Sequence, residues 1–442
     1  MAKDGKNKVS VLAATAVGLG AIIGAGIFVL SGTAIAIAGA DALIAFVIVG
    51  ILATIVALEF GELGTIFPHL EGASYSYVRE AFGSELGFIT GIIMYFSFAT
   101  SISVVALGFG SYLSSMLGMT QGIIAILFAI MLIAVLSLIS ILGVKKAVRT
   151  DLGLVIIKVL VLLFFIAFAI FIAVSQHLIS LGNFSVSIAQ GSFSSLLSAS
   201  IVIFFAYTGF QTIMTLTPKI RGGGMGAAKA TLFAVVISMV LYIAIVVSLL
   251  MLVPASQFTI SADPLALALG HVHAPSWLLT VVDIGALVAT ASATLAMIVG
   301  GSRLMYQISS DGLLPRIFRK YNKSKDVAES TVIASALIGT VMLFSGNIFV
   351  ITAISNFGVL FAYLMVSLAV IHFRRKGVTA GFKVPFYPYL PIASAIMILM
   401  FMLGMPSEAL VIGVIMIMAL IVIYYSLREA EDKKIIKIRL FK

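Results

Sequence analysis

The chain is 442 residues long, 62% apolar and only 10% charged, with a formal net charge of +10 at pH 7 and no cysteine. This composition excludes a soluble domain, because repeated apolar stretches of about 20 residues are typical of helices that cross a membrane. Without cysteine, the chain can form no disulfide, thiol nucleophile or cysteine-based metal site.

We predict an all-α integral membrane protein with a single transmembrane domain. Twelve apolar spans follow one another at 9–38, 42–67, 84–117, 121–143, 151–175, 193–218, 228–252, 275–308, 329–346, 348–372, 387–404 and 407–427. With a cytoplasmic N-terminus, every lysine and arginine except Lys158 falls on the cytoplasmic side. The basic charge therefore indicates orientation and contact with lipid headgroups rather than nucleic-acid binding, and 428–442 is expected to form a cytoplasmic tail.

The first span contains three glycines near its middle, Gly20, Gly24 and Gly26, in the stretch GLGAIIGAGIFVLS at 18–31. Each glycine weakens a helix by about 1 kcal/mol relative to alanine, and it also lets a ligand approach the backbone. We interpret 24–26 as a break that presents backbone groups to a solute, which a membrane tolerates only inside protein or beside a cavity. Close helix packing through Gly20 and Gly24 is the alternative interpretation.

The sixth span carries a second candidate break in FFAYTGFQ at 204–211. The two breaks occupy corresponding positions if 9–175 and 193–373 are two five-span repeats of opposite orientation, followed by two further helices at 387–427. Paired broken helices in inverted repeats indicate the binding site of a secondary transporter. The N-terminus of a half-helix suits a carboxylate and freed carbonyls suit an ammonium, which together fit a zwitterionic amino acid.

Five stretches carry a resemblance to a known family: GAIIGAGIFVLSG (20–32), PHLEGASYSYVREAFGSELGFITG (68–91), FFAYTGF (204–210), SDGLLPRIF (310–318) and FKVPFYPYLP (382–391). With these motifs the chain resembles the permeases of the amino acid–polyamine–organocation superfamily, in particular the proton-coupled amino acid transporters. The resemblance implies a five-plus-five inverted-repeat fold in which helices one and six are unwound at the substrate.

The resemblance places the substrate cradle on both interrupted spans, at Ile22, Gly24, Ala25, Gly26, Phe205, Ala206 and Thr208. It also implies that Phe205 closes over the substrate from the extracellular side, whereas ordinary core packing is the alternative role of this residue. Gln211 stands where many relatives carry an acidic residue, so a mechanism that needs a carboxylate at this position is not carried over.

Lys158 lies about eight residues into the fifth span, ~12 Å from its cytoplasmic end. A charged amine at this depth marks a functional site unless its long side chain reaches the membrane surface. The resemblance implies that Lys158 contacts the Gly20 carbonyl and Ser292 and takes part in proton coupling, with its protonated form bridging spans one, five and eight. A snorkelling side chain and a static tether are the alternatives.

The leading hypothesis is a proton-coupled symporter, and an amino acid or amine exchanger of the same fold is the alternative. Glu59 and Glu62 lie near the inner end of the second span, where they are expected to face a cavity or an interface rather than the substrate. Since no carboxylate falls beside the two breaks, neutral amino acids are the expected substrates. No cofactor, metal or enzymatic activity is expected, because the pair His271 and His273 is poor support for a metal and the sequence has no HExxH or similar motif. The sequence leaves the amino acid, the proton stoichiometry and the oligomeric state open.

Overall fold

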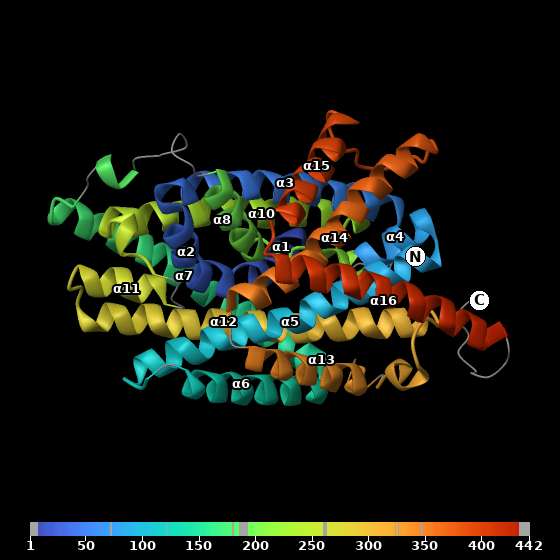
Figure 1. Ribbon diagram of the computed structural model, residues 1–442, viewed down its shortest axis with the longest axis horizontal. Helices are drawn as coiled ribbons and strands as arrows, with labels where there is room; N and C mark the ends of the chain where they lie inside the picture. Colours follow the sequence, from blue (N-terminus) through green and yellow to red (C-terminus); the bar gives the residue numbers. More distant parts are fainter. Residues whose placement is uncertain are drawn as a thin grey trace.

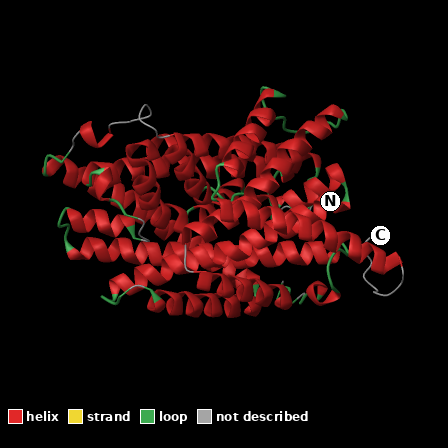
Figure 2. Ribbon diagram, viewed as in Figure 1, coloured by secondary structure: helices red, strands yellow, loops and turns green. Residues whose placement is uncertain are grey.

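A computed structural model describes residues 8–70, 73–120, 122–178, 181–184, 193–259, 263–322, 324–325, 327–345 and 348–432. Across these residues the secondary structure consists of helices, joined by short loops and two isolated β-bridges (Figure 2). Lys3, Lys6 and the part of the predicted tail from 433 to 442 lie outside the described residues. The first part of that predicted tail is helical, since the last helix continues to Asp432.

The helices follow the predicted apolar spans along the chain. The α-helices are α1 (Val11–Ile22), α2 (Ala25–Ala38), α3 (Ala42–Ile66), α4 (Ser74–Phe82), α5 (Ser84–Met116), α6 (Ile123–Leu142), α7 (Val144–Ser175), α8 (Phe193–Ala206), α9 (Gln211–Met214), α10 (Gly223–Leu252), α11 (Pro264–His271), α12 (Ser276–Ser310), α13 (Glu329–Met342), α14 (Ile348–Arg375), α15 (Tyr389–Leu403) and α16 (Ser407–Asp432). Short 3₁₀ turns are η1 (Gly39–Asp41), η2 (Leu181–Phe184), η3 (Thr217–Lys219), η4 (Ala255–Gln257), η5 (Arg316–Arg319) and η6 (Leu343–Ser345).

The prediction of an all-helical membrane protein is confirmed. Within the described residues, nine helical segments are long and apolar enough to cross a membrane, and three shorter apolar helices lie at Val11–Ile22, Glu329–Ser345 and Tyr389–Leu403. The shorter helices fall in three of the twelve predicted spans, so the count of twelve stays a prediction, as does the inverted relation of the two repeats.

The bundle has an interior and a lipid-facing surface, both of them apolar. In Figure 1, α5 and α12 run side by side through the molecule, with α6 at one edge. Leu138 on α6, Leu160 on α7 and Val422 on α16 are exposed apolar side chains. In an aqueous protein such surfaces would cause aggregation, whereas here they match the hydrocarbon that surrounds a membrane protein.

The predicted interface role of Glu62 agrees with its position between α3 and α14. Its carboxylate is buried and accepts two hydrogen bonds from the Arg374 guanidinium, at 2.5 and 2.8 Å, and one from the backbone N–H of Val384 at 2.6 Å. A fork of this kind fixes both partners in one geometry. It therefore ties the C-terminal end of α3 to α14 and to the segment that leads into α15.

Glu62→Ala should lower the melting temperature of the purified protein strongly, because it leaves the Arg374 charge and the Val384 N–H without their acceptor. Breaking a buried pair by removing one partner costs about 3–5 kcal/mol. The matched control is Glu329→Ala, which breaks the Lys325–Glu329 pair, whose two side chains are 39% and 44% exposed. Exposed pairs contribute at most about 1 kcal/mol, so equal shifts in the two variants would contradict the assignment.

Candidate substrate and coupling site

The first predicted break is an interruption of the helix between α1 and α2. Helix α1 ends at Ile22, Ile23 has extended backbone angles (φ −75°, ψ 94°), and α2 begins at Ala25. The N-cap residue of α2 is Gly24, which has no side chain to satisfy the first N–H groups of the helix. These N–H groups and the last carbonyls of α1 are the backbone groups that a helix cannot pair internally.

The second predicted break lies between α8 and α9. Helix α8 ends at Ala206, and 207–210 form turns before the four-residue helix α9. Gly209 has a φ of +111°, a left-handed conformation that glycine adopts without steric cost. Its N–H donates to the side-chain oxygen of Gln211 at 3.0 Å. Gln211 therefore takes a structural role in the turn through an acceptor oxygen that a carboxylate could also have supplied.

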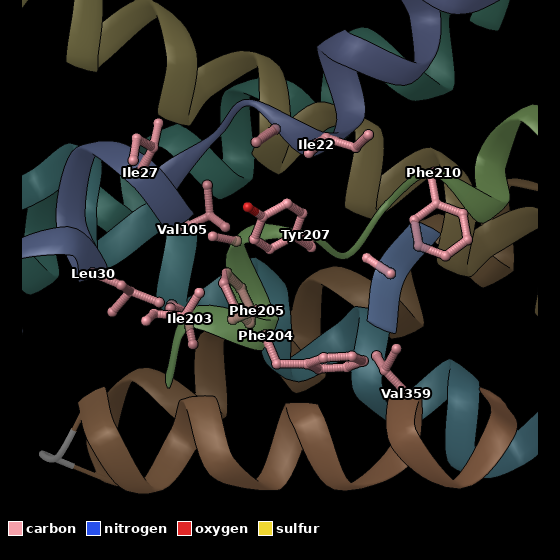
Figure 3. Close-up of a cluster of buried hydrophobic side chains, with 14 of the residues drawn as sticks. Ile22, Ile27, Leu30, Val105, Ile203, Phe204, Phe205, Tyr207, Phe210 and Val359 are labelled. Carbon is pink, nitrogen blue, oxygen red and sulfur yellow. The ribbon is translucent and has the colours of Figure 1, made fainter. Parts of the chain in front are cut away.

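The two interruptions cross in direct contact at the centre of the bundle. A Cβ atom placed on Gly26 would lie 2.3 Å from the Cα of Ala206, and one on Gly209 would lie 2.6 Å from the carbonyl oxygen of Ala21. Figure 3 shows the side chains of both interruptions in one apolar cluster, with Ile22 and Ile27 from the first and Phe205 and Tyr207 from the second. Gly26 and Gly209 are thus required for the close approach of two backbones, and the presentation of backbone groups to a solute stays a prediction.

The structure brings the predicted cradle residues together. Gly26 is buried against Ala206, and Gly24 is buried against Ala293 on α12. Ala25 is the first residue of α2. Ile22 is 2% exposed, and Phe205 and Thr208 are each 4% exposed. These three side chains are therefore buried in this conformation. The burial of Phe205 fits both a closed gate and ordinary core packing.

Lys158 reaches the end of α1 from α7. Its side chain is fully buried, and its Nζ donates to the carbonyl of Gly20 at 2.5 Å and to the hydroxyl of Ser292 on α12 at 3.1 Å. The amine thus lies inside the protein rather than at the membrane surface, in contact with both predicted partners. Gly20 is among the last residues of α1, where free carbonyls and the negative end of the helix dipole favour a cation.

Tyr242 on α10 is a site residue that the sequence did not reveal. Its buried hydroxyl lies 2.9 Å from the carbonyl of Ile22 and 3.0 Å from the carbonyl of Ala206, so a single O–H group spans the ends of α1 and α8. A lone tyrosine in an apolar span resembles any core aromatic residue. Only the fold shows that its hydroxyl meets the free carbonyls of both interruptions.

Tyr242→Phe should weaken substrate binding several-fold with little loss of stability. The variant removes the hydroxyl that holds the two carbonyls at a fixed separation, and a hydrogen bond of this kind contributes about 1 kcal/mol. The measurement is the substrate concentration at half-maximal uptake. The matched control is Tyr207→Phe, whose hydroxyl donates instead to the carbonyl of Phe46 at 3.2 Å. An unchanged half-maximal concentration in Tyr242→Phe would rule out the positioning role.

Polar bonds join segments that are distant in sequence near the start of α1 and the end of α12. Val9, just before α1, pairs its backbone with Lys219 and Arg221 after α9, each bond being 2.9 Å long. Arg79 forms a 2.6 Å ion pair with Asp311, which also accepts the hydroxyl of Tyr75 at 2.7 Å. Burial, and then the charge of Asp311, raise the pKa of Tyr75, so this hydroxyl remains a donor. These bonds connect the start of α1 to the segment after α9, and α4 to the end of α12.

An apolar helical bundle whose centre is formed by two interrupted helices is typical of the membrane transport proteins. The chain belongs to the amino acid permease family, whose sequence model matches residues 9–427. The resemblance to amino acid–polyamine–organocation permeases that the five motifs indicated is thereby confirmed.

Individual relatives match over nearly the whole chain. The branched-chain amino acid permease BcaP of Bacillus subtilis (strain 168) is 26% identical over 453 residues, covering 98% of this chain and 95% of the relative. The methylthioribose transporter of the same organism is 29% identical over 434 residues, covering 93% and 91%. A solved structure of the Eremococcus coleocola manganese transporter aligns with a TM-score of 0.59 at 14% identity, covering 94% and 93%, which supports the fold alone.

Proposed function

We propose that this permease takes up neutral amino acids across the cytoplasmic membrane by proton-coupled symport with alternating access. The observation that carries the proposal is the meeting of the two helix interruptions, with Lys158 and Tyr242 bonded to the carbonyls at their ends. The proposed topology has both termini in the cytoplasm and twelve spans in two inverted five-helix repeats plus two helices, in agreement with the distribution of lysine and arginine.

The proposed cradle binds the two charges common to all α-amino acids. The uncapped N-terminus of α2 offers N–H groups and the positive end of a helix dipole to the carboxylate. The carbonyls of Ile22 and Ala206, which now accept the Tyr242 hydroxyl, have the acceptor character that an ammonium requires. Each carbonyl oxygen has two lone pairs, so we expect the ammonium to bind while the Tyr242 hydroxyl keeps the two carbonyls in position.

The surroundings of the cradle favour an uncharged substrate side chain. The residues around it in Figure 3 are aliphatic or aromatic, among them Val105, Ile203 and Phe205. A cationic substrate side chain would need a carboxylate in contact with it, since an unpaired charge in an apolar site is costly. Phe205 is proposed as the gate on the extracellular side.

Lys158 is proposed to couple proton movement to the movement of α1. In its protonated form the amine holds Gly20 on α1 and Ser292 on α12 together, as in the present conformation. Loss of the proton weakens the grip on the Gly20 carbonyl, because a neutral amine is a poorer donor than an ammonium. Helix α1 is then free to move, which opens the site toward the cytoplasm.

The test is uptake by proteoliposomes that contain the purified protein. Labelled neutral and cationic amino acids, together with methylthioribose because one relative carries it, are offered with and without an inward proton gradient. The proposal expects neutral amino acids to accumulate above equilibrium only with the gradient. Counterflow that is indifferent to pH would favour the alternative, an exchanger, and accumulation of methylthioribose alone would reject an amino acid substrate.

A further inference from the structure

A second buried acidic group lies one helical turn from Glu62, outside the substrate site. Glu59 on α3 has no exposed surface. Its two carboxylate oxygens accept the hydroxyl of Ser394 on α15 at 2.5 Å and that of Ser367 on α14 at 2.7 Å. The two serine hydroxyls lie 3.1 Å apart, so the three side chains form a closed triangle joining three helices.

Among the described residues, no basic side chain forms an ion pair with Glu59. The nearby charge of Arg374 is taken by Glu62. The other titratable groups on the surrounding helices are Tyr363, His372 and Arg375 on α14, the exposed Lys229 and the buried Tyr242 on α10, and the exposed Tyr389 on α15; α8 has no titratable side chain. The Tyr363 hydroxyl donates to Gln211, and the Tyr242 hydroxyl lies within hydrogen-bond distance of the carbonyls of Ile22 and Ala206. An unpaired carboxylate in such surroundings is costly, and proton uptake removes the cost.

The hydrogen bonds of this triangle can be satisfied in both protonation states. Ser367 Oγ also lies 3.1 Å from the carbonyl of Tyr363, and Ser394 Oγ lies 3.1 Å from the carbonyl of Pro391. When Glu59 is ionised, both hydroxyls donate to it. When Glu59 is protonated, its hydrogen is donated to one serine, whose own hydrogen turns to the backbone carbonyl. Rotation of hydroxyl groups alone thus lets the hydrogen-bond network accommodate either protonation state of Glu59.

The turn of α14 that contains Tyr363 and Ser367 connects Glu59 with the second helix interruption. The Tyr363 carbonyl is the alternative acceptor for Ser367, and the Tyr363 hydroxyl donates to Gln211 Oε1 at 2.7 Å. That oxygen also accepts the N–H of Gly209. A change in the hydrogen bonds of Glu59 therefore acts on the turn of α14 whose Tyr363 hydroxyl positions Gln211, the acceptor of the Gly209 N–H.

We propose that Glu59, Ser367 and Ser394 form a second, reversible proton-binding site, distinct from Lys158 and linked to the second interruption through Tyr363 and Gln211. The proton site itself is independent of the transported substrate. Its effect on transport rests on the proposed function. The two parts are therefore tested by separate measurements.

Infrared difference spectroscopy of the purified protein between acid and alkaline pH tests the proton site. With isotope-labelled glutamate, the protein should show a C=O band of a protonated glutamic acid that disappears at alkaline pH. The band should be absent in Glu59→Gln and should remain in Lys158→Met. Ser394→Ala keeps the carboxyl but removes one hydrogen-bond partner, so it should move the band to a different frequency; this variant also serves if Glu59→Gln does not fold.

A band that persists in Glu59→Gln would overturn the site. So would a band that remains at alkaline pH and keeps its frequency in Ser394→Ala. The transport measurement is the pH profile of counterflow, which should be flattened in Glu59→Gln and unchanged in Glu329→Ala. An unaltered profile in Glu59→Gln would overturn the link to the second interruption. If no amino acid proved to be a substrate, the infrared result would still decide whether Glu59 binds a proton.

Discussion

Replacing Lys158 should abolish uptake driven by an inward proton gradient, so that the initial rate with the gradient falls to the rate without it. The amine is fully buried and bonded to α1 and α12. If its proton is released and regained in each cycle, a side chain that cannot exchange a proton at this position cannot replace it. Initial uptake rates into proteoliposomes at fixed internal pH give the measurement.

Two replacements of Lys158 separate proton exchange from a static tether. Arginine keeps the positive charge and stays protonated throughout the accessible pH range. If release of the proton frees α1, Lys158→Arg should slow both gradient-driven uptake and counterflow, whereas Lys158→Met should lose the gradient dependence and keep counterflow. A static tether predicts the reverse, because arginine retains the tether and methionine removes it.

The control for these variants is Ile156→Ala, two residues away on α7, where the side chain is 62% exposed and faces away from α1 and α12. This variant should transport with normal proton dependence. Proton-dependent accumulation in Lys158→Met at the rate of the unaltered protein would remove Lys158 from the coupling mechanism.

The sequence alone predicts the features of this protein that depend on local pattern. The apolar spans predict the helices, because a backbone in hydrocarbon must satisfy its hydrogen bonds internally. The glycines at 24, 26 and 209 predict the two interruptions, because glycine weakens a helix. In the structure a side chain at Gly26 or Gly209 would meet the opposite interruption, and one at Gly24 would meet Ala293 on α12. Lys158 stands out, since a single amine in an apolar span has few physical explanations.

The contacts of Lys158 with Gly20 and Ser292 were implied by the family resemblance, but the other features that depend on partners from distant spans were not predicted. Tyr242 resembles any core aromatic residue until the fold places its hydroxyl between two free carbonyls. Ser367 and Ser394 resemble serines that bond to their own helix, which is the usual state in membrane helices. Helical periodicity is too weak in an all-apolar span to show which face meets which neighbour, so these pairings follow from the fold and not from the pattern.

Gly26→Ala should reduce substrate affinity by about 5- to 160-fold, because the new methyl group would lie 2.3 Å from the Cα of Ala206. The obstacle is a backbone atom, so no side-chain rotation relieves it. The two interruptions must separate, at an overpacking cost of about 1–3 kcal/mol, which acts directly on the proposed cradle. Binding of labelled substrate to the purified protein measures the loss.

Gly153→Ala on α7 is the matched control, because nothing lies within 4 Å of a Cβ atom at that position. Alanine is the better helix former, so this variant should bind and transport as the unaltered protein does. If Gly26→Ala bound substrate with unchanged affinity, the substrate would not lie between the two interruptions. The cradle would then have to be sought elsewhere, because α2 and α8 cannot keep their present contact with a methyl group between them.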